Sequence, residues 1–344
     1  MRHPNTHRFL IVRLGSLGDV IHGMPVAAAL RERYPEARID WMVDPRYVEP
    51  LGLLTGLDAA IPVNPRRSPR VLMATLRGLR SVRYTAAIDL QGLIKSAVLA
   101  RLAGAWQTIG LTSAHLREPL ARRFYTDVVD PGPRVHVIEK GLALLEPLGV
   151  RTPRIVFPLV STNGEVQQEA RRLAGGDGYV LLNPGAAWPN KRWPAERFGA
   201  LAVRLREVTG LRSLVLWGPG EEADAAAVVA TASGAASLAP RTRIVDLFTL
   251  ARGARLVVSG DTGPLHVAAA VSAPVVALFG PTIAERNGPW SADDVVVSRT
   301  VNCSCLYRRT CRTGSPCIDE VTVDEVFAAA RSRLATATRR RSGA

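Results

Sequence analysis

The chain has 344 residues, of which 47% are apolar, and its 44 basic and 30 acidic residues leave a formal net charge of +14. This length exceeds one hydrophobic core and predicts about two domains. The charge favours acidic partners such as nucleotides and phospholipid head groups. Nucleic acid is disfavoured, because aromatic residues make up only 6% and no stacking side chains interleave the arginines.

No segment has the composition of a targeting or membrane-spanning sequence. The most apolar stretch, residues 265–280, is shorter than a bilayer-crossing helix and contains His266 and Pro274. All cysteines fall between residues 303 and 317, so none links distant parts of the chain. We therefore expect a cytoplasmic protein whose contact with an anionic membrane surface is peripheral.

Strands and helices alternate along the N-terminal part of the chain, which predicts a parallel α/β sheet. A long amphipathic helix is expected over residues 137–148. Short apolar runs predict buried strands at residues 8–14, 38–43, 60–63 and 86–89.

A glycine turn, Gly15-Ser16-Leu17-Gly18-Asp19, separates the first strand from a helix expected over residues 20–34. The glycines allow a ligand to approach the backbone closely. The third glycine of a dinucleotide-binding fingerprint is absent. Asp19 lies where a carboxylate either faces a ligand or caps the helix, and the sequence leaves both open.

A basic segment without acidic residues lies between the third and fourth strands. Leu72, Leu76 and Leu79 recur at helical spacing and predict a helix whose arginines point outward. Such a segment is either a solvated helix face or a binding site for an anionic group. Its arginines are Arg66, Arg67, Arg70, Arg77, Arg80 and Arg83.

A Pro-rich stretch without periodicity, residues 150–165, predicts a domain boundary. We expect one domain over residues 1–155, a second over 156–335, and a disordered basic tail over 336–344. The second domain has predicted strands at residues 179–182, 214–217, 256–259 and 275–279, and the first three of these end in polar, glycine-containing loops.

Residues 255–282 read as strand, turn, helix and strand. Gly260 to Pro264 supply a flexible turn, residues able to cap a helix, and a proline suited to the first helical turn. The exposed N–H groups and the dipole of such a helix start attract anions. Asp261 alone is explained equally well as a helix cap. Three glycine-containing loops at the carboxyl edge of one parallel sheet together predict a nucleotide site.

Four cysteines follow in the pattern Cys-x-Cys-x5-Cys-x5-Cys: Cys303, Cys305, Cys311 and Cys317. Four thiols this close can hold a structural zinc ion, although the first spacing is tighter than is usual for zinc. Reduced thiols or a redox-active pair are the alternative, and the sequence favours them.

Several long stretches carry a resemblance to one family. The sequence resembles glycosyltransferase family 9, the lipopolysaccharide heptosyltransferases, and looks closest to the members that add the first heptose. The resemblance implies a GT-B architecture, in which two Rossmann-like domains face each other across a cleft and the second holds the nucleotide sugar. The matching stretches are LIVRLGSLGDVIHGMPV, AAIDLQGLIKSA, REPLARRFY, NKRWPAERF and VVSGDTGPLHVAAAVSAPVVALFGPT.

The resemblance also implies a reaction. ADP-heptose would be the donor and a Kdo-lipid A type molecule the acceptor, at the inner face of the inner membrane. Asp19 would be the general base for a single inverting displacement. Lys191 would neutralise the departing diphosphate, helped by the amides of Thr262 and Gly263. The chain contains no Asp-x-Asp motif, so no metal is expected at the diphosphate.

The remaining site residues are also assigned from the resemblance. Asp261 and His266 would line the sugar and phosphate pocket, Glu222 or its neighbour Glu221 would contact the ribose, and Thr242 the nucleoside. Ala186 and Ala187 stand where the family has hydroxyl side chains, so only backbone groups remain for the donor there. The acceptor's carboxylates and phosphates would meet Arg66, Arg67, Arg70 and Arg117.

Three other functions remain open from the sequence. A related transferase with another donor or acceptor would use the same residues. A non-catalytic bilobal protein that binds a nucleotide would need no base at Asp19. A nucleotide-sugar epimerase would form product without an acceptor.

Overall fold

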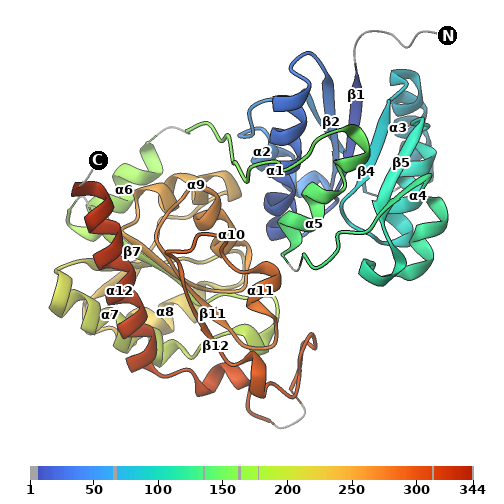
Figure 1. Ribbon diagram of the computed structural model, residues 1–344. Coiled ribbons are helices and arrows are strands. Elements are labelled where there is room, and N and C mark those ends of the chain that lie inside the picture. The colour runs from blue at the N-terminus through green and yellow to red at the C-terminus, as the bar shows by residue number, and fades with distance from the viewer. Residues whose placement is uncertain are drawn as a thin grey trace. The chain divides into compact units, whose positions relative to one another are not determined.

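The computed structural model describes residues 7–64, 68–134, 136–161, 164–176, 178–311 and 314–342. The chain divides into two compact units, unit 1 (residues 1–160) and unit 2 (residues 161–344), so the division falls after Val160 where the sequence predicted residue 155. Each unit contains one parallel six-stranded sheet flanked by helices (Figure 1).

The sheet of unit 1 has the strand order β3-β2-β1-β4-β5-β6. Its strands are β1 (Arg8–Val12), β2 (Arg38–Val43), β3 (Ala59–Pro62), β4 (Ala86–Asp89), β5 (Gln107–Leu111) and β6 (Asp127–Val129). Its helices are α1 (Leu17–Arg33), α2 (Val48–Leu51), α3 (Pro69–Val82), α4 (Ile94–Leu102) and α5 (Val137–Ala143), with 3-10 turns η1 (Pro45–Tyr47), η2 (Ser113–His115), η3 (Pro119–Phe124) and η4 (Glu146–Leu148).

The sheet of unit 2 repeats this topology, with the order β12-β11-β10-β7-β8-β9. Its strands are β7 (Tyr179–Asn183), β8 (Arg212–Val215), β9 (Ala236–Leu238), β10 (Leu256–Gly260), β11 (Val275–Phe279) and β12 (Val295–Ser298). Its helices are α6 (Glu165–Ala174), α7 (Ala195–Thr209), α8 (Glu222–Thr231), α9 (Ile244–Gly253), α10 (Gly263–Ala270), α11 (Ala284–Asn287) and α12 (Val323–Ser342), with 3-10 turns η5 (Pro189–Lys191), η6 (Thr300–Asn302) and η7 (Cys317–Glu320).

Central strands follow the sequence prediction because helices cover both of their faces. Residues Phe9 to Val12 of β1 are fully buried, as expected of a strand inside a parallel sheet. β2, β4 and β11 have the predicted bounds. The sequence did not predict β5, β6, β9 and β12, which lie toward the sheet edges and are short or mixed in polarity.

The helix expected over residues 137–148 is shorter in the structure. α5 ends at Ala143, and a separate 3-10 turn, η4, contains Pro147 in its first turn. Proline has no N–H to donate to the Ala143 carbonyl and its ring crowds the preceding turn, so Pro147 disfavours a continuation of α5 at this point. The apolar periodicity alone therefore overestimated this helix.

Residues 336–342, which the sequence predicted to belong to a disordered tail, form the end of α12, which continues to Ser342. Residues 335–342 contain neither glycine nor proline, so local propensity does not end the helix after Leu334. The last two residues lie outside the described part of the chain. None of the described helices has the length and apolarity needed to cross a bilayer.

The strand order predicts where a ligand would bind in each unit. In open parallel sheets the crevice lies beyond the carboxyl ends of the strands, where the strand order reverses. This point falls between β1 and β4 in unit 1 and between β7 and β10 in unit 2. Asp19 follows β1, and Asp261 follows β10.

Candidate active site

Buried polar groups join the two central strands of unit 2 at their carboxyl ends. The Asn183 side chain, at the end of β7, donates to the hydroxyls of Ser259 (2.9 Å) and Thr262 (2.8 Å). Gly260 ends β10, where an added Cβ would lie 3.0 Å from the carbonyl oxygen of Lys191. Glycine is favoured there because the loop that carries Lys191 packs directly on the strand end.

Lys191 and Asp261 form a buried ion pair at this edge. The Lys191 Nζ lies 2.5 Å from the Asp261 Oδ2, and it also donates to the Asp261 carbonyl at 3.2 Å. Only 14% of the Lys191 side chain and 5% of the Asp261 side chain are exposed. The ammonium also lies 4.8 Å from the centre of the Trp188 ring. Because an ammonium has three N–H groups, one remains for a ligand.

Asp261 is the centre of a larger cluster. Thr282 donates to its Oδ2 at 2.7 Å, Asn287 at 3.4 Å, and the His266 Nε2 lies 3.3 Å from its Oδ1. Burial opposes ionisation of this carboxyl, but the hydrogen bond and charge of His266 and the charge of Lys191 outweigh it, so its pKa lies well below the usual range. The site therefore contains a permanent carboxylate beside a fixed ammonium.

The N-terminus of α10 lies beside this ion pair. Thr262 is the N-cap and Gly263 and Pro264 begin the helix, as the sequence predicted. The amides of Thr262 and Gly263 precede the first intrahelical hydrogen bond, in which Leu265 donates to the Thr262 carbonyl at 3.1 Å. The Lys191 ammonium and these two amides are called the anion site below. Together they suit a diphosphate.

The other predicted donor residues lie on loops at the same edge. Ala187 is exposed, and its carbonyl accepts from Arg309 at 3.0 Å. Glu222 is exposed at the start of α8, and Thr242 is half-buried before α9. The neighbouring Glu221 turns inward and accepts the Gly218 N–H at 3.0 Å. The geometry therefore favours Glu221 over Glu222 as the carboxylate that lies against the donor loops.

In unit 1, Asp19 occupies the third residue of α1 and is 35% exposed. Its Oδ2 accepts from the backbone N–H of Ser16 at 2.8 Å, and its Oδ1 forms an ion pair with Arg13. Asp19 therefore caps α1, which is one of the two roles that the sequence left open. Its second carboxylate oxygen contacts the Arg13 guanidinium. Arg13 in turn donates to the Leu90 carbonyl, in the loop after β4.

This environment keeps Asp19 ionised. Partial burial opposes the charge, but the charge and hydrogen bond of Arg13 and the N–H of Ser16 outweigh it, so the pKa of Asp19 is lowered. A lowered pKa weakens a base but guarantees that the carboxylate is free of protons at neutral pH.

Of the predicted acceptor arginines, two lie outside the described residues: Arg66 and Arg67. Arg70 is the second residue of α3 and Arg117 follows β5, and both are exposed. The adjacent Glu118 accepts the Ile94 N–H at 2.7 Å, which places this loop beside the start of α4. No contact between Arg70 and Arg117 occurs in the described part of unit 1. Both arginines lie at the carboxyl edge of the sheet of unit 1.

Sequence reasoning missed Asn183, Thr282, Asn287 and Arg13 as site residues. Asn183 had a detectable signal, because a polar residue ends an otherwise apolar strand next to a glycine turn. Thr282 and Asn287 had none, because they follow a different strand from Asp261 and only the sheet brings them together.

Asp261→Asn is expected to destabilise unit 2 by about 3 kcal/mol, because it leaves the Lys191 ammonium buried without its counter-charge. The carboxyl's pKa is lower in the folded than in the unfolded state. Its contribution is therefore fully present above the ordinary pKa of about 4 and is lost only as the pH falls further. Thermal unfolding at pH 7 and at lower pH measures this difference.

Asp324→Asn is the matched control, because the same substitution breaks an ion pair with Arg204 in which Asp324 is 86% exposed. It should cost less than about 1 kcal/mol. Equal losses in the two variants would show that burial does not set the energy of the Lys191–Asp261 pair.

Two Rossmann-like units of one topology in a single chain are the architecture of the GT-B class of glycosyltransferases, and in this chain the second unit carries an anion site. Comparison with solved structures agrees with this class. The Escherichia coli heptosyltransferase WaaC with ADP superimposes with a TM-score of 0.74 and 26% identity, covering 96% of this chain and 99% of that one. WaaC with ADP-2-deoxy-2-fluoro heptose gives 0.73 and 26%, covering 93% and 98%.

The profile of glycosyltransferase family 9 (heptosyltransferase) matches residues 72–315. The lipopolysaccharide heptosyltransferase 1 of Pseudomonas aeruginosa is 31% identical over 316 residues, which cover 88% of this chain and 87% of that protein. The chain therefore belongs to glycosyltransferase family 9, and it is a heptosyltransferase of lipopolysaccharide core synthesis.

Proposed function

We propose that the protein transfers L-glycero-D-manno-heptose from ADP-heptose to a Kdo-lipid A type acceptor with inversion at the anomeric carbon. The observation that carries this proposal is the anion site at the carboxyl edge of β10. Its ammonium and two amides offer N–H donors to the oxygens of a diphosphate.

The donor assignment is supported by the relatives. Two WaaC structures hold ADP or an ADP-heptose analogue, and the curated relative from Pseudomonas aeruginosa is a heptosyltransferase 1. In this chain Asn183 donates to the Thr262 hydroxyl, which holds the residue that begins α10 against the end of β7. The nucleoside would extend over the loops after β8 and β9, where Glu221 and Thr242 lie.

The reaction follows from the roles of the two units. The acceptor hydroxyl oxygen forms a bond to the anomeric carbon while the bond from that carbon to the diphosphate oxygen breaks. Asp19 takes the hydroxyl proton, and ADP leaves with its negative charge held by Lys191 and the α10 amides. A single displacement from the opposite face inverts the anomeric configuration.

Lys191 also contributes to selectivity for the transition state. Its ammonium already pairs with Asp261, so an uncharged sugar gains little from it. The leaving diphosphate oxygen gains negative charge only as its bond to the anomeric carbon breaks. The hydrogen bond from the remaining Lys191 N–H to this oxygen then becomes stronger. Asp261 holds the ammonium in place for this role.

The acceptor side rests on exposed cations of unit 1. Arg70 and Arg117 present guanidinium groups at the sheet edge that carries Asp19. Planar guanidinium groups suit carboxylates and phosphates, the groups of a Kdo-bearing lipid A. A lipid acceptor places the reaction at the inner face of the inner membrane, with the protein bound peripherally through its positive charge.

The test is ADP release from ADP-heptose in the presence and absence of Kdo-lipid A, with the product's anomeric configuration read by NMR. Release only with both substrates, with inversion and without added Mg²⁺, supports the proposal. Product formed from the donor alone indicates an epimerase. Donor binding without any turnover indicates a nucleotide-binding protein, and transfer from ADP-glucose at an equal rate would contradict the donor assignment.

A further inference from the structure

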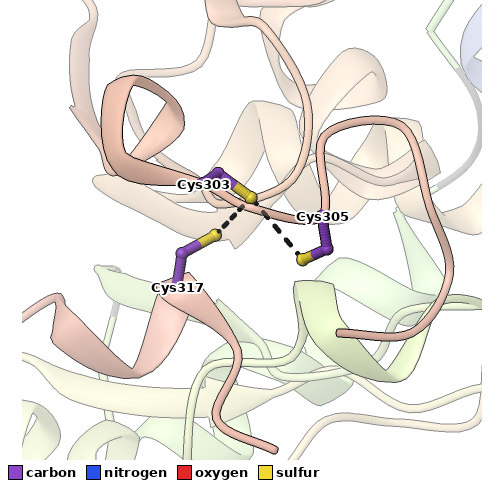
Figure 2. A group of neighbouring side chains, drawn as sticks. All are labelled: Cys303, Cys305 and Cys317. Carbon is purple, nitrogen blue, oxygen red and sulfur yellow. Dashed lines mark hydrogen bonds between the residues drawn. The ribbon is translucent and has the colours of Figure 1, made fainter. Parts of the chain in front are cut away.

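The cysteine segment forms a compact cluster of sulfur atoms in unit 2 that the proposed transfer reaction does not use. Cys303 lies at its centre, with its Sγ 3.6 Å from that of Cys305 and 2.9 Å from that of Cys317 (Figure 2). Cys311 is disulfide-bonded to Cys305. All four cysteine sulfurs of the chain therefore gather in one place.

The spacing of the sulfurs suits a metal ion. Four sulfurs that each lie about 2.3 Å from a tetrahedral zinc ion are roughly 3.8 Å apart. The ligand atoms of Cys303, Cys305 and Cys317 all lie within 4.8 Å of one another. Small side-chain rotations bring such a group to coordination distance. Two of its members, Cys305 and Cys317, are buried, which protects a bound ion from exchange.

The surroundings suit the negative charge of four thiolates. Residues 303–317 contain three arginines, which offset part of the thiolate charge, and no acidic residue, while Asp319 and Glu320 follow after Ile318. The buried Asn190 side chain donates toward the Cys305 Sγ at 3.5 Å and the Cys311 Sγ at 3.6 Å, and to the Arg308 carbonyl at 2.8 Å. Hydrogen bonds from a second layer of this kind orient thiolate ligands and stabilise their charge.

We propose that Cys303, Cys305, Cys311 and Cys317 form a four-thiolate site for a soft divalent metal ion, zinc or ferrous iron. In the reduced chain each thiol loses one proton as the ion binds, so no electron transfer is involved. The Cys305–Cys311 disulfide and the metal complex are alternative states of the same sulfurs.

The site fastens two loops of the anion site. Asn190 adjoins Lys191, and Arg309, within the segment, donates to the Ala187 carbonyl at 3.0 Å. The Tyr307 N–H donates to the Pro281 carbonyl at 2.7 Å, next to Thr282. An ion bound to the four cysteines therefore holds the loops that carry Lys191 and Thr282 in position, and contributes no reacting atom.

The experiment measures metal content of the full chain, expressed in a reducing cytoplasm, without a histidine tag, and purified without oxygen or chelators. Mass spectrometry of the elements should find about one zinc or iron ion per chain, and identifies which. Cys303→Ser and Cys317→Ser should each lose most of it. Ser304→Ala, an exposed residue between two of the cysteines, should retain it.

A second measurement decides the question if the cysteine variants do not fold. The reduced wild-type chain is titrated with Co²⁺, whose visible absorption reports tetrahedral thiolate ligation. A metal-free wild-type chain that shows no such absorption, or variants that keep their metal, overturns the proposal. Metal content does not depend on which sugar is transferred, so this outcome is separate from the fate of the proposed function.

Discussion

Asp19→Asn is expected to lower the rate of heptosyl transfer by about 10²- to 10⁴-fold, the usual contribution of a general base. The asparagine oxygen can still accept the Ser16 N–H, so the cap of α1 is kept, but an amide cannot take the acceptor's proton. ADP affinity, measured by calorimetry, should be unchanged because the nucleotide is assigned to unit 2. Transfer rates with saturating donor and acceptor test the expectation.

Asp44→Asn is the matched control for this substitution. Asp44 follows β2 at the same sheet edge, pairs with Arg46 at 2.9 Å, and has a pKa lowered chiefly by that hydrogen bond. The Asp44→Asn variant should transfer heptose at the normal rate.

The pKa of Asp19 is also lowered, so its carboxylate stays ionised as the pH falls from 8 to 5. Protonation of Asp19 should therefore cause no loss of kcat/KM over that range. A rate for Asp19→Asn above a tenth of wild type would place the base elsewhere.

Lys191→Met is expected to lower kcat by about 10²- to 10³-fold, the cost of removing a charged donor from a developing anion. It should also weaken ADP binding by about 2 kcal/mol, or roughly 30-fold, the value of a hydrogen bond to a charged group. Methionine is similar in length to lysine but carries no charge to place over the Trp188 ring. Calorimetry with ADP and single-turnover transfer separate the two effects.

Lys191→Arg distinguishes charge from geometry. Arginine keeps the positive charge, but its planar guanidinium group is larger than an ammonium. The Lys191 ammonium lies between the side-chain carboxylate and the backbone carbonyl of Asp261, where a larger group fits less well. We expect ADP binding to be largely restored and kcat only in part. Lys95→Met, which removes the same charge from α4 of unit 1, should leave ADP affinity unchanged. Equal losses of ADP affinity in Lys95→Met and Lys191→Met would mean that net charge, and not the anion site, binds the nucleotide.

Asp261 and Asp19, the carboxylates at the edges of the two sheets, differ in how firmly their side chains are held and in how exposed they are. Asp261 is held by Lys191, His266, Thr282 and Asn287, so it is fixed and has little freedom to act as a base. Asp19 is more exposed and contacts Arg13 and Ser16. A residue that must accept a proton needs an accessible oxygen, and this physical difference is why we propose Asp19 as the base and Asp261 as the residue that positions Lys191.

Much of the site followed from the sequence because it depends on local patterns. A strand, a glycine turn and a helix start are adjacent in the chain, so Gly260, Thr262 and Gly263 were predictable from turn and capping chemistry alone. The same holds for Asp19 after β1. Helix ends were less predictable, since Pro147 interrupts α5 where the periodicity continues, and α12 runs past the apolar pattern to Ser342.

The sequence by itself determined the alternation of strands and helices, the parallel sheets and the turns that bear the anion site. Burial periods, glycines and caps act between near neighbours in the chain, which is why they can be read without coordinates. Only the tertiary structure decided which side chains contact one another in the site. The contacts of Lys191 with Asp261, of Asp261 with Thr282, and of Asn190 with the cysteines join residues 21 to 121 positions apart. Such pairs are set by strand order and by the packing of loops at one sheet edge.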